Sequence, residues 1–485
     1  VTIAADGAVD FLLAFDEAPA AARTVLAMAP AEPPAVDWSA GLSKPHSSEP
    51  RYLAAQERAI ATLRLNEVRD ASGKLLGGAP AKTHYNDLWV WDSAFQALGI
   101  SEWGAPDAFA QLDSIYRGQV LDADSPEHGL LYNHVDEAGN TVRLELAGYT
   151  DEFSQAPAIG FAMREVYDRS ARDEAAKAAL QRSFDASLPF IDWWFRRRDR
   201  DGDGLVEYNG GWESGLDNSP RFTELWGDTT ARFAADEADP RPKLNCVDAN
   251  AWLYLYLMEL ASSAEALGRT DAQTFRDRAA ALAAKIEDPV EGFWDDTRGL
   301  YADTVRAAGK RRLRPTVTPI AVFPLFAGLT RDEARARRVI EGLLLDPAKL
   351  WGPFGVPTVA FDDPSYAAGD YWRGPVWFNT SYAMAIALFR YGYEAEAEEL
   401  KKRLLELGAS DHGLWEYYDS KTGAGLNVYQ FGWTGALYLE LLRDRHQAEG
   451  FAVGKAREGE LHRLQRLSDG AVLAEVWVEA ELAGV

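Results

Sequence analysis

The sequence predicts an all-α protein in which twelve helices form six hairpins that close into an (α/α)6 toroid. Apolar residues recur at helical spacing from Pro50 to Leu442, with capping residues near the expected helix ends. Short and long connections alternate between these helices, and a short connection makes its two helices antiparallel neighbours. The long connections then share one face, which we expect to carry the functional residues. An irregular helical domain is the plain alternative on the pattern alone.

Each expected helix combines an apolar repeat of roughly 3.6 residues with start or stop signals. The expected helices are 51–65, 89–100, 105–120, 153–168, 171–197, 246–267, 270–286, 316–327, 330–345, 375–391, 393–407 and 430–443. Short connections lie at 101–104, 169–170, 268–269, 327–329 and 392. Long connections lie at 66–88, 121–152, 198–245, 287–315, 346–374 and 409–429.

The two ends of the chain are expected to be β-like extensions of the helical part. A strand is expected at Val9–Phe15, followed by an Ala-rich helical stretch, Ala18–Met28, and a Pro-rich linker, Ala29–Pro34. Near the other end, apolar and polar residues alternate within 470–482, which is typical of a half-buried strand. We therefore expect an N-terminal extension, a helical domain and a C-terminal extension, with the two extensions packed together as one small β unit. Their expected ranges are 1–49, 50–445 and 446–485.

Composition and charge exclude several classes of protein. Of the 485 residues, 47% are hydrophobic and 26% are charged, as in ordinary globular proteins and unlike a disordered chain. No apolar run reaches the ~18 residues that a transmembrane helix needs. The net charge is −25, from 75 acidic and 50 basic residues, which disfavours binding to nucleic acids and to anionic membranes.

The single cysteine limits covalent and metal chemistry. Cys246 has no partner for an internal disulfide and cannot build a zinc–thiolate site alone, so we expect a small buried residue. The start of the chain lacks a signal-peptide pattern, and we expect a cytoplasmic protein. The sequence indicates no oligomeric state.

Aromatic residues are the unusual part of the composition. There are 16 Trp, 19 Tyr and 21 Phe, and many of the Trp lie in connections rich in Gly, Pro and Asp. Flat amphipathic rings suit sites that stack on ligands such as sugars. In the first long connection Trp89, Trp91 and Asp92 come together where a helix begins. Asp92 beside these rings could accept hydrogen bonds from sugar hydroxyls; the alternative is that it caps the helix.

Two further connections place polar residues on the same expected face. Gln155 lies in the first turn of an expected helix, where it faces either solvent or a ligand. Trp372, Arg373 and Trp377 crowd the start of another helix, whose first residue we expect to be Pro375. Arg373 either ties connections together by hydrogen bonds or pairs with a hydroxyl or carboxylate of a ligand.

The third long connection begins with an acidic turn. Asp199, Asp201 and Asp203 imitate the first half of an EF-hand calcium loop. The bidentate Glu expected at the twelfth position is missing, because Gly210 stands there and Glu207 comes too early. A turn whose side chains bond to their own backbone is therefore favoured, and calcium is the alternative.

Three carboxyl groups in the long connections are candidates for acid–base chemistry. Glu213 and Asp217 lie in a Gly-flanked segment beside Trp212. An apolar ring next to a carboxyl raises its pKa, as a general acid requires. The chemistry of the sequence does not choose between these two residues. Glu416 lies between two aromatic residues in an expected loop on the same face, so it could pair with Asp217.

Four motifs together resemble glycoside hydrolase family 63, and within it the bacterial branch of mannosylglycerate and glucosylglycerate hydrolases. They are Trp89-Val-Trp-Asp92, Glu213-Ser-Gly-Leu-Asp-Asn-Ser-Pro220, Tyr371-Trp-Arg-Gly-Pro-Val-Trp-Phe-Asn379 and Gln430-Phe-Gly-Trp-Thr434. The resemblance covers roughly residues 50–443 and has the motifs in the family's order. It implies an (α/α)6 toroid and an inverting α-glycosidase with no organic cofactor and no catalytic metal, although some family members hold a structural calcium ion.

The resemblance also implies roles for particular residues. Asp217 matches the general acid, which protonates the glycosidic oxygen, and Glu416 matches the general base, which activates a water molecule. Gln155 matches a position near the aglycone end of the substrate. The sugar site would be lined by Tyr85, Trp89, Trp91, Asp92, Trp212, Gly215, Trp372, Arg373, Trp377 and Gln430.

The expected substrate is a small α-glucoside or α-mannoside, such as glucosylglycerate, mannosylglycerate or a short oligosaccharide. The choice between glucose and mannose and the identity of the aglycone stay open. A polysaccharide lyase on the same fold would need a basic groove for uronates, which a net charge of −25 disfavours. A non-catalytic sugar-binding protein is the remaining alternative.

Overall fold

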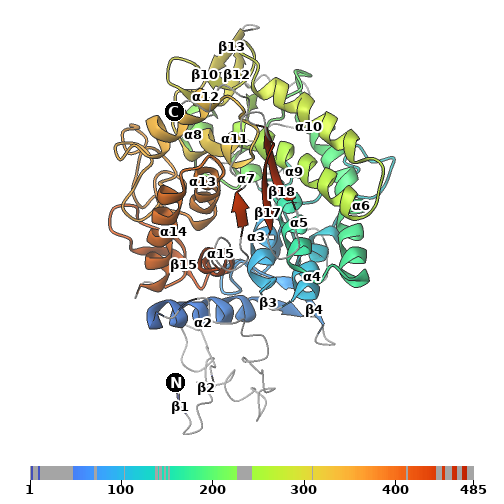
Figure 1. Cartoon of the computed structure of the whole chain (residues 1–485), viewed down its shortest axis with the longest axis vertical. Helices are drawn as coiled ribbons and strands as arrows, with labels where there is room; N and C mark the ends of the chain where they lie inside the picture. Colours follow the sequence, from blue (N-terminus) through green and yellow to red (C-terminus); the bar gives the residue numbers. More distant parts are fainter. Residues whose placement is uncertain are drawn as a thin grey trace. The chain divides into compact units, whose positions relative to one another are not determined.

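The computed structural model of the chain is helix-rich, which confirms the all-α class (Figure 1). It divides into two compact units, Val1–Leu42 and Ser43–Val485, and the residues discussed below, apart from two short strands near the start of the chain, belong to the second. The residues that it describes are 2–3, 9–10, 47, 49–69, 74–102, 104–136, 140, 145–146, 149–150, 153–226, 243–307, 310–410, 413–443, 451–453, 461–466 and 472–477.

The helices follow one another over most of the second unit. They are α2 (Pro50–Leu65), α3 (Val90–Ile100), α4 (Ala105–Tyr116), α5 (Ile159–Arg169), α6 (Glu174–Arg198), α7 (Gly211–Ser214), α8 (Pro220–Trp226), α9 (Val247–Ala266), α10 (Ala272–Ile286), η1 (Pro319–Val322), α11 (Phe323–Phe326), α12 (Glu333–Val339), η2 (Ile340–Leu344), α13 (Phe378–Arg390), α14 (Glu394–Ala409) and α15 (Gly432–Leu442). Within the described ranges, no helix is both long and apolar enough to span a lipid bilayer.

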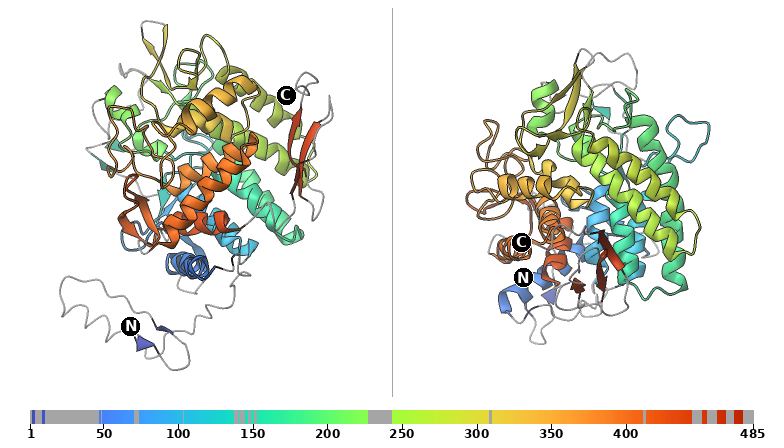
Figure 2. Two further views of the ribbon diagram at one scale, coloured as in Figure 1. Left: turned by 60° about the vertical axis from the view of Figure 1, so that its left-hand side comes forward. Right: turned by 45° about the horizontal axis from the view of Figure 1, so that its top comes forward.

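Helices joined by short connections pack against each other: α3 on α4, α5 on α6, α9 on α10, and α13 on α14 (Figure 1, Figure 2). A second set of contacts links one helix of each pair to the next, from α3 through α5, α9, α11, α13 and α15, and α15 in turn packs on α3. Every residue of α3 and of α15 is buried, as expected for helices with neighbours on all sides. The helices α10 and α14 bury one face only.

The contact between α3 and α15 depends on a glycine. A Cβ atom at Gly99 would lie 2.5 Å from the Cα of Ala436, closer than real atoms approach. The two helices therefore touch through their backbones, and nearer their starts the Trp91 ring meets the Trp433 ring edge-on at 5.0 Å.

Short antiparallel strands occupy the long connections. The paired strands are β3 (Glu67–Arg69) with β4 (Leu75–Gly78), β5 (Leu88–Trp89) with β6 (His134–Val135), β7 (Glu145–Leu146) with β8 (Tyr149–Thr150), β12 (Thr304–Ala307) with both β9 (Leu244–Asn245) and β13 (Lys310–Leu313), β10 (Trp294–Asp295) with β11 (Leu300–Tyr301), and β14 (Trp415–Tyr418) with β15 (Gly425–Tyr429). We expected only loops in the long connections, because strands of two to five residues are too short to show a clear alternation of apolar and polar side chains.

Two expected helices begin later than predicted. The helix expected from residue 153 begins at Ile159, and residues 153–158 form neither helix nor strand, in keeping with the bias against helix at the residue preceding Pro157. The helix expected from Pro375 begins at Phe378. Val376 instead pairs with Tyr418, exchanging two backbone hydrogen bonds of 2.8 and 3.0 Å with it.

Two other expected helices are interrupted. The predicted helix 316–327 consists of the 3-10 turn η1 followed by the short α11, each with a proline near its start. The predicted helix 330–345 begins at Glu333, where the Asp332 side chain accepts from the Arg335 N–H, and continues from Ile340 as a π-helix. The other expected helices occur, with ends displaced by a few residues.

Strands are present at both ends of the chain, as predicted. The strand β2 (Val9–Asp10) pairs with β1 (Thr2–Ile3), whereas β16 (Phe451–Val453), β17 (Leu461–Arg466) and β18 (Val472–Trp477) form a separate antiparallel sheet. The expected Ala-rich helix and Pro-rich linker, 18–34, lie outside the described residues. Packing of the two ends on each other and the three expected domain boundaries stay predictions.

Candidate active site

Glu416 is a buried carboxyl group surrounded by hydrogen-bond donors. It lies on strand β14, not in the loop that we expected, with 2% of its surface exposed. Asn427 Nδ2 donates to its Oε2 at 2.5 Å, and the Tyr85 and Tyr371 hydroxyls donate to its Oε1 at 3.3 and 3.5 Å. Burial raises the pKa of Glu416 to about 7, while the hydrogen bonds, that of Asn427 first, act in the opposite direction.

Asp217 lies between α7 and α8 and is electrostatically coupled to Glu416. Its side chain keeps part of its surface exposed, so a ligand can reach it. The loss of solvent around it, and then the negative charge of Glu416, raise the pKa of Asp217 to about 8. A hydrogen bond with Tyr371 opposes this rise. The Tyr371 side chain therefore contacts both carboxyl groups.

Asp92 is a third carboxyl group of the same cluster. It is the third residue of α3 and is 4% exposed. Burial first, and then the charges of Glu416 and Asp217, hold the pKa of Asp92 well above its usual range. One helix start and two connections, far apart in the sequence, thus bring acidic side chains together.

The geometry separates Glu213 from Asp217, which the sequence could not do. The guanidinium of Arg198 donates to both oxygens of Glu213, at 2.7 and 2.8 Å. The backbone N–H groups of Ser154 and Asn209 donate to the same carboxylate, at 3.0 and 2.5 Å. Glu213 is therefore a buried structural anion that joins α6, α7 and the segment before α5.

Stacked aromatic rings surround the acidic cluster. The Trp372 ring lies parallel to that of Trp377 at 3.7 Å between centroids, and Trp377 stacks on Tyr417 at 4.7 Å. The Trp91 ring lies 5.8 Å from Trp372. All three Trp side chains are at most 7% exposed, and Trp377 is fully buried beneath its neighbours. Trp377 therefore packs against the rings of Trp372 and Tyr417 and supports them.

Gly215 allows Trp91 to approach the segment that carries Asp217. Its backbone has φ = +73°, the left-handed region that favours glycine. A Cβ atom there would also lie 2.3 Å from the Trp91 ring. A larger residue at this position would move the ring.

Tyr85, Trp89 and Gln155 lie around the start of α3. The Tyr85 ring meets that of Trp89 edge-on at 6.1 Å, and Trp89 stacks on His134 at 4.2 Å. Gln155 is buried in the segment before α5, not in the first turn of a helix as expected. Its Oε1 accepts a hydrogen bond from the backbone N–H of Trp91 at 3.2 Å, so it holds the start of α3 in place.

The remaining expected residues are partly exposed near these rings. Arg373 donates to Thr223 Oγ1 at 3.1 Å and lies 3.7 Å from an Asp370 oxygen, so it ties the connection before α13 to α8. Trp212 lies in α7. Gln430 has a left-handed backbone, with φ = +59°, and its carbonyl accepts from Asn66 at 3.0 Å.

Two residues that contact the carboxyl groups were missing from our predicted list. Tyr371 stands in a motif that we quoted, next to Trp372 and Arg373, and that proximity was the only available signal. Asn427 gives no such signal, because its contact with Glu416 exists only through the pairing of β14 and β15.

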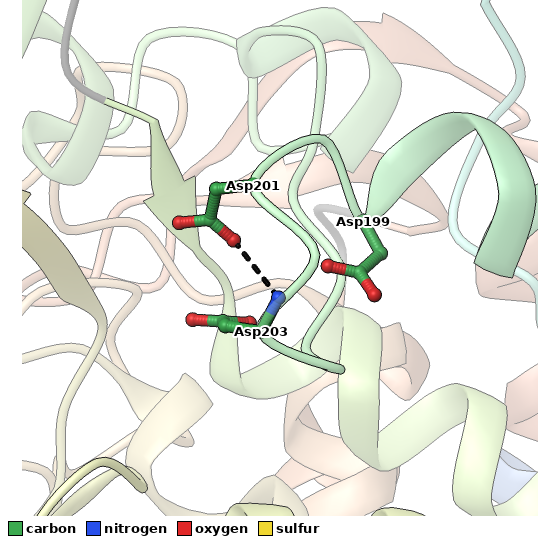
Figure 3. Close-up of side chains that lie close together, drawn as sticks. All are labelled: Asp199, Asp201 and Asp203. Atoms are coloured by element: carbon green, nitrogen blue, oxygen red, sulfur yellow. Dashed lines mark hydrogen bonds between the residues drawn. The ribbon is translucent and has the colours of Figure 1, made fainter.

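The acidic turn brings Asp199, Asp201 and Asp203 together (Figure 3). One oxygen of each lies within 4.8 Å of the others, which suits a divalent cation. The same side chains also bond to the turn itself: Asp199 accepts from the Gly204 N–H at 3.1 Å, and Asp203 from the Leu205 N–H at 2.9 Å. This agrees with the self-bonded turn that the sequence favours, and calcium stays a prediction.

Positive side chains already face the acidic turn. Arg306 lies 3.7 Å from Asp201 and 3.4 Å from Asp203. Glu207, the fourth calcium candidate, is fully buried and pairs with Arg200. A cation would therefore have to compete with Arg306 for two of the three carboxylates.

Comparison with known proteins supplies the family. The family model described as the mannosylglycerate hydrolase MGH1-like glycoside hydrolase domain matches residues 85–434. The mannosylglycerate hydrolase of Rubrobacter radiotolerans is 26% identical over 75% of this chain and 92% of its own, and the glucosylglycerate hydrolase of Mycolicibacterium hassiacum is 27% identical over 82% and 100%. The crystal structure of the family 63 mannosylglycerate hydrolase from Thermus thermophilus in complex with glucose matches 79% of this chain and 99% of its own, with 26% identity and a TM-score of 0.68. The chain therefore belongs to the mannosylglycerate hydrolase MGH1-like family of glycoside hydrolases.

Proposed function

We propose that Asp217 and Glu416 are the general acid and the general base with which this chain hydrolyses the α-glycosidic bond of a small glycoside. The chain is an inverting α-glycosidase that acts on small glycosides. In such enzymes an acidic carboxyl protonates the leaving oxygen while a carboxylate activates water on the opposite face of the sugar.

The observation that carries the assignment is a pair of electrostatically coupled carboxyl groups, of which Glu416 accepts hydrogen bonds from Asn427, Tyr85 and Tyr371. The pKa of Asp217 is raised to about 8 and that of Glu416 to about 7. The hydrogen bonds to Glu416 favour its ionised form, so a proton shared by the pair is favoured on Asp217, which is then able to give it to the glycosidic oxygen. The ionised Glu416 is then able to take a proton from water.

The neighbouring residues suit the binding of one sugar ring. Asp92, buried beside both carboxyl groups, would accept hydrogen bonds from sugar hydroxyls. Trp91 and Trp372 would cover the apolar face of the ring. Tyr85, Trp89, Trp212, Gly215, Arg373, Trp377 and Gln430 would complete or support the wall, with Gln155 toward the aglycone.

The substrate class follows the relatives' names. Relatives at 26–28% identity are mannosylglycerate or glucosylglycerate hydrolases, so glucosylglycerate, mannosylglycerate or a short oligosaccharide is the proposed substrate. We propose that no organic cofactor takes part. A cytoplasmic location stays a prediction.

The proposed architecture is the (α/α)6 toroid. Its support is the succession of helix contacts from α3 through α5, α9, α11, α13 and α15 and back to α3. In a toroid the long connections gather at one face, which agrees with the meeting of Asp217 and Glu416, from two long connections, with Asp92 in the first turn of α3.

Proton NMR of a substrate mixture tests the proposed function. The mixture contains glucosylglycerate, mannosylglycerate, kojibiose, nigerose and trehalose, and spectra are recorded from the first minute after the enzyme is added. We expect a newly released β-anomer, and the substrate consumed identifies the aglycone. The variants Asp217→Asn and Glu416→Gln should fold and lose activity by about 10²- to 10⁴-fold. Sugar binding without turnover by the unmodified chain would instead support a non-catalytic protein.

A further inference from the structure

We propose that Asn427 is a positioning residue, which holds one oxygen of Glu416 and leaves the other as the atom that accepts the proton from water. This inference rests on the proposed function of Glu416. It is carried by the hydrogen bond between the two side chains and by the backbone irregularity that creates it.

The hydrogen bonds treat the two oxygens of Glu416 unequally. Asn427 Nδ2 lies 2.5 Å from Oε2, which is a short charge-assisted contact. The Tyr85 and Tyr371 hydroxyls lie 3.3 and 3.5 Å from Oε1, beyond the usual range of about 2.5–3.0 Å for such bonds. Oε2 is therefore held tightly, whereas Oε1 is loosely contacted and can exchange a tyrosine for a water molecule.

A β-bulge aims Asn427 at Glu416. In the hairpin, Trp415 pairs with Tyr429 and Tyr417 pairs with Leu426, so Glu416 alone faces two residues, Asn427 and Val428. Such a bulge turns a side chain away from the regular alternation, and bulges are frequent next to active sites.

The backbone of Asn427 has the conformation that such a bulge needs. Its φ is +64°, a left-handed value that asparagine tolerates better than most residues. Asparagine therefore meets two requirements at this position, because it accepts the backbone geometry and supplies an N–H donor.

A neutral donor suits the charges that face Glu416. The titratable groups around it are Tyr85, Asp92, Asp217, Tyr371 and Tyr417. An amide stabilises the ionised carboxylate without adding a charge that would also ionise Asp217. A charged residue at position 427 would disturb the two carboxyl groups. A lysine there would favour loss of the proton from Asp217, and an aspartate would repel Glu416.

The step that Asn427 supports is balanced. A water O–H gives its proton to Glu416 Oε1 while the water oxygen bonds to the anomeric carbon. The bond from that carbon to the glycosidic oxygen breaks, and the proton of Asp217 goes to the leaving oxygen. Asn427 exchanges no proton; it keeps Oε2 fixed so that Oε1 stays directed at the water.

The test is the pH profile of kcat/KM for Asn427→Gly. Glycine accepts φ = +64°, so the bulge is kept while the amide is lost. We expect the acidic limb, which reports ionisation of Glu416 in the free enzyme, to move up by about one pH unit, since a hydrogen bond to a charged group is worth that much. Relative to the unmodified enzyme, kcat/KM of Asn427→Gly at pH 6 should therefore fall about tenfold more than its kcat/KM on the alkaline limb.

Two further variants are measured alongside Asn427→Gly. Asn427→Asp keeps the backbone preference but places a negative charge beside Glu416, so the acidic limb should move in the same direction and further. Lys421→Ala is the matched control in the same hairpin, since Lys421 contacts the Tyr366 ring and not Glu416. Its profile should match that of the unmodified enzyme, and thermal melting should show all three variants folded.

The outcomes separate this inference from the proposed function. An inactive Glu416→Gln enzyme together with unshifted acidic limbs in both Asn427 variants would overturn the role of Asn427 and leave the function standing. A fully active Glu416→Gln enzyme would overturn both. A shift in both Asn427 variants, absent in Lys421→Ala, would support the assignment.

Discussion

Asp217 and Glu416 both carry a carboxyl group, and their surroundings differ in a way that suits the different roles that we propose for them. Glu416 is buried but meets donors on both oxygens, which limits the rise of its pKa. Asp217 has fewer compensating bonds and lies in the field of Glu416, so its pKa rises further. Glu213, four residues before Asp217 in the chain, is neutralised by Arg198 instead. Environment, not residue type, therefore distinguishes the proposed acid and the proposed base from each other and from the structural anion.

The pH dependence of activity follows from this pair. Glu416 must be ionised, so kcat/KM should rise with pH through a value near 7, the pKa of that residue. Asp217 must be protonated, so kcat/KM should fall as the pH passes through its pKa near 8. The two carboxyls interact, and the two apparent values belong to the pair. Initial rates from pH 5 to 10 check this, and a profile without an alkaline limb would contradict the role of Asp217.

At the scale of elements, the connections need particular backbone shapes to bring the side chains together. Gly215, Tyr371, Asn427 and Gln430 all have positive φ angles, and all lie in the segments around the carboxyl groups. The cost of these conformations is offset by packing: Asn218, next to Asp217, bonds at 2.9 Å to Asp370 and accepts from the Trp372 N–H at 2.7 Å. The acidic segment and the aromatic segment are therefore fastened to each other.

Gly215→Ala tests how closely these segments must approach. The added methyl would collide with the Trp91 ring at 2.3 Å, so we expect a loss of activity of about 10²-fold from displacement of the ring. Gly202→Ala is the matched control, because Gly202 has the same φ of +73° but open space around its Cβ position. Both variants should lose about 1–2 kcal/mol of stability from the left-handed backbone. Equal activities in the two variants would contradict a role for the Trp91 position.

The acidic turn yields a second test at this scale. Its carboxylates already bond to the turn and to Arg306, so we expect the melting temperature and activity to be unchanged by EDTA or by added calcium. A site filled at about 100 times its Kd would instead stabilise the protein by ~2.7 kcal/mol. A calcium-dependent rise in melting temperature that Asp201→Asn abolishes would show that the calcium alternative is correct.

At the scale of the whole molecule, a buried ion pair ties together helices that are distant in the sequence. Arg169, at the end of α5, donates to both oxygens of Glu440 in α15, at 2.7 and 2.6 Å. The Tyr382 hydroxyl of α13 lies 3.5 Å from the same carboxylate. Both charged side chains are at most 4% exposed, so their pairing is required once they are buried.

Breaking this pair should destabilise the fold without changing the chemistry. Glu440→Ala leaves the Arg169 guanidinium buried without its main partner, and we expect a loss of about 3–5 kcal/mol in the free energy of unfolding. The double variant Arg169→Met, Glu440→Leu should recover much of it, because apolar side chains of similar volume need no counter-charge. Urea denaturation measures both, and an unchanged midpoint for Glu440→Ala would show that water or another group compensates the arginine.

The sequence by itself determined the fold class, most helices and the family. Helices such as α2 and α9 were predicted within one residue at each end, because a repeat of apolar residues is a local property of the sequence. The motifs likewise placed Asp92 and Asp217 among the candidates, and the aromatic neighbours of Glu416 added that residue. The short strands were missed because two to five residues are too few to show a clear alternation of apolar and polar side chains.

Only the tertiary structure decided how the candidates relate to one another. The anchoring of Glu213 by Arg198, the strand position of Glu416 and the contacts of Asn427 all depend on segments that approach through helix packing. The pKa values depend on burial and on charges brought near by that packing, and neither is encoded in the neighbouring residues. A sequence lists the chemical groups of a site, but distances between those groups arise when the whole chain folds.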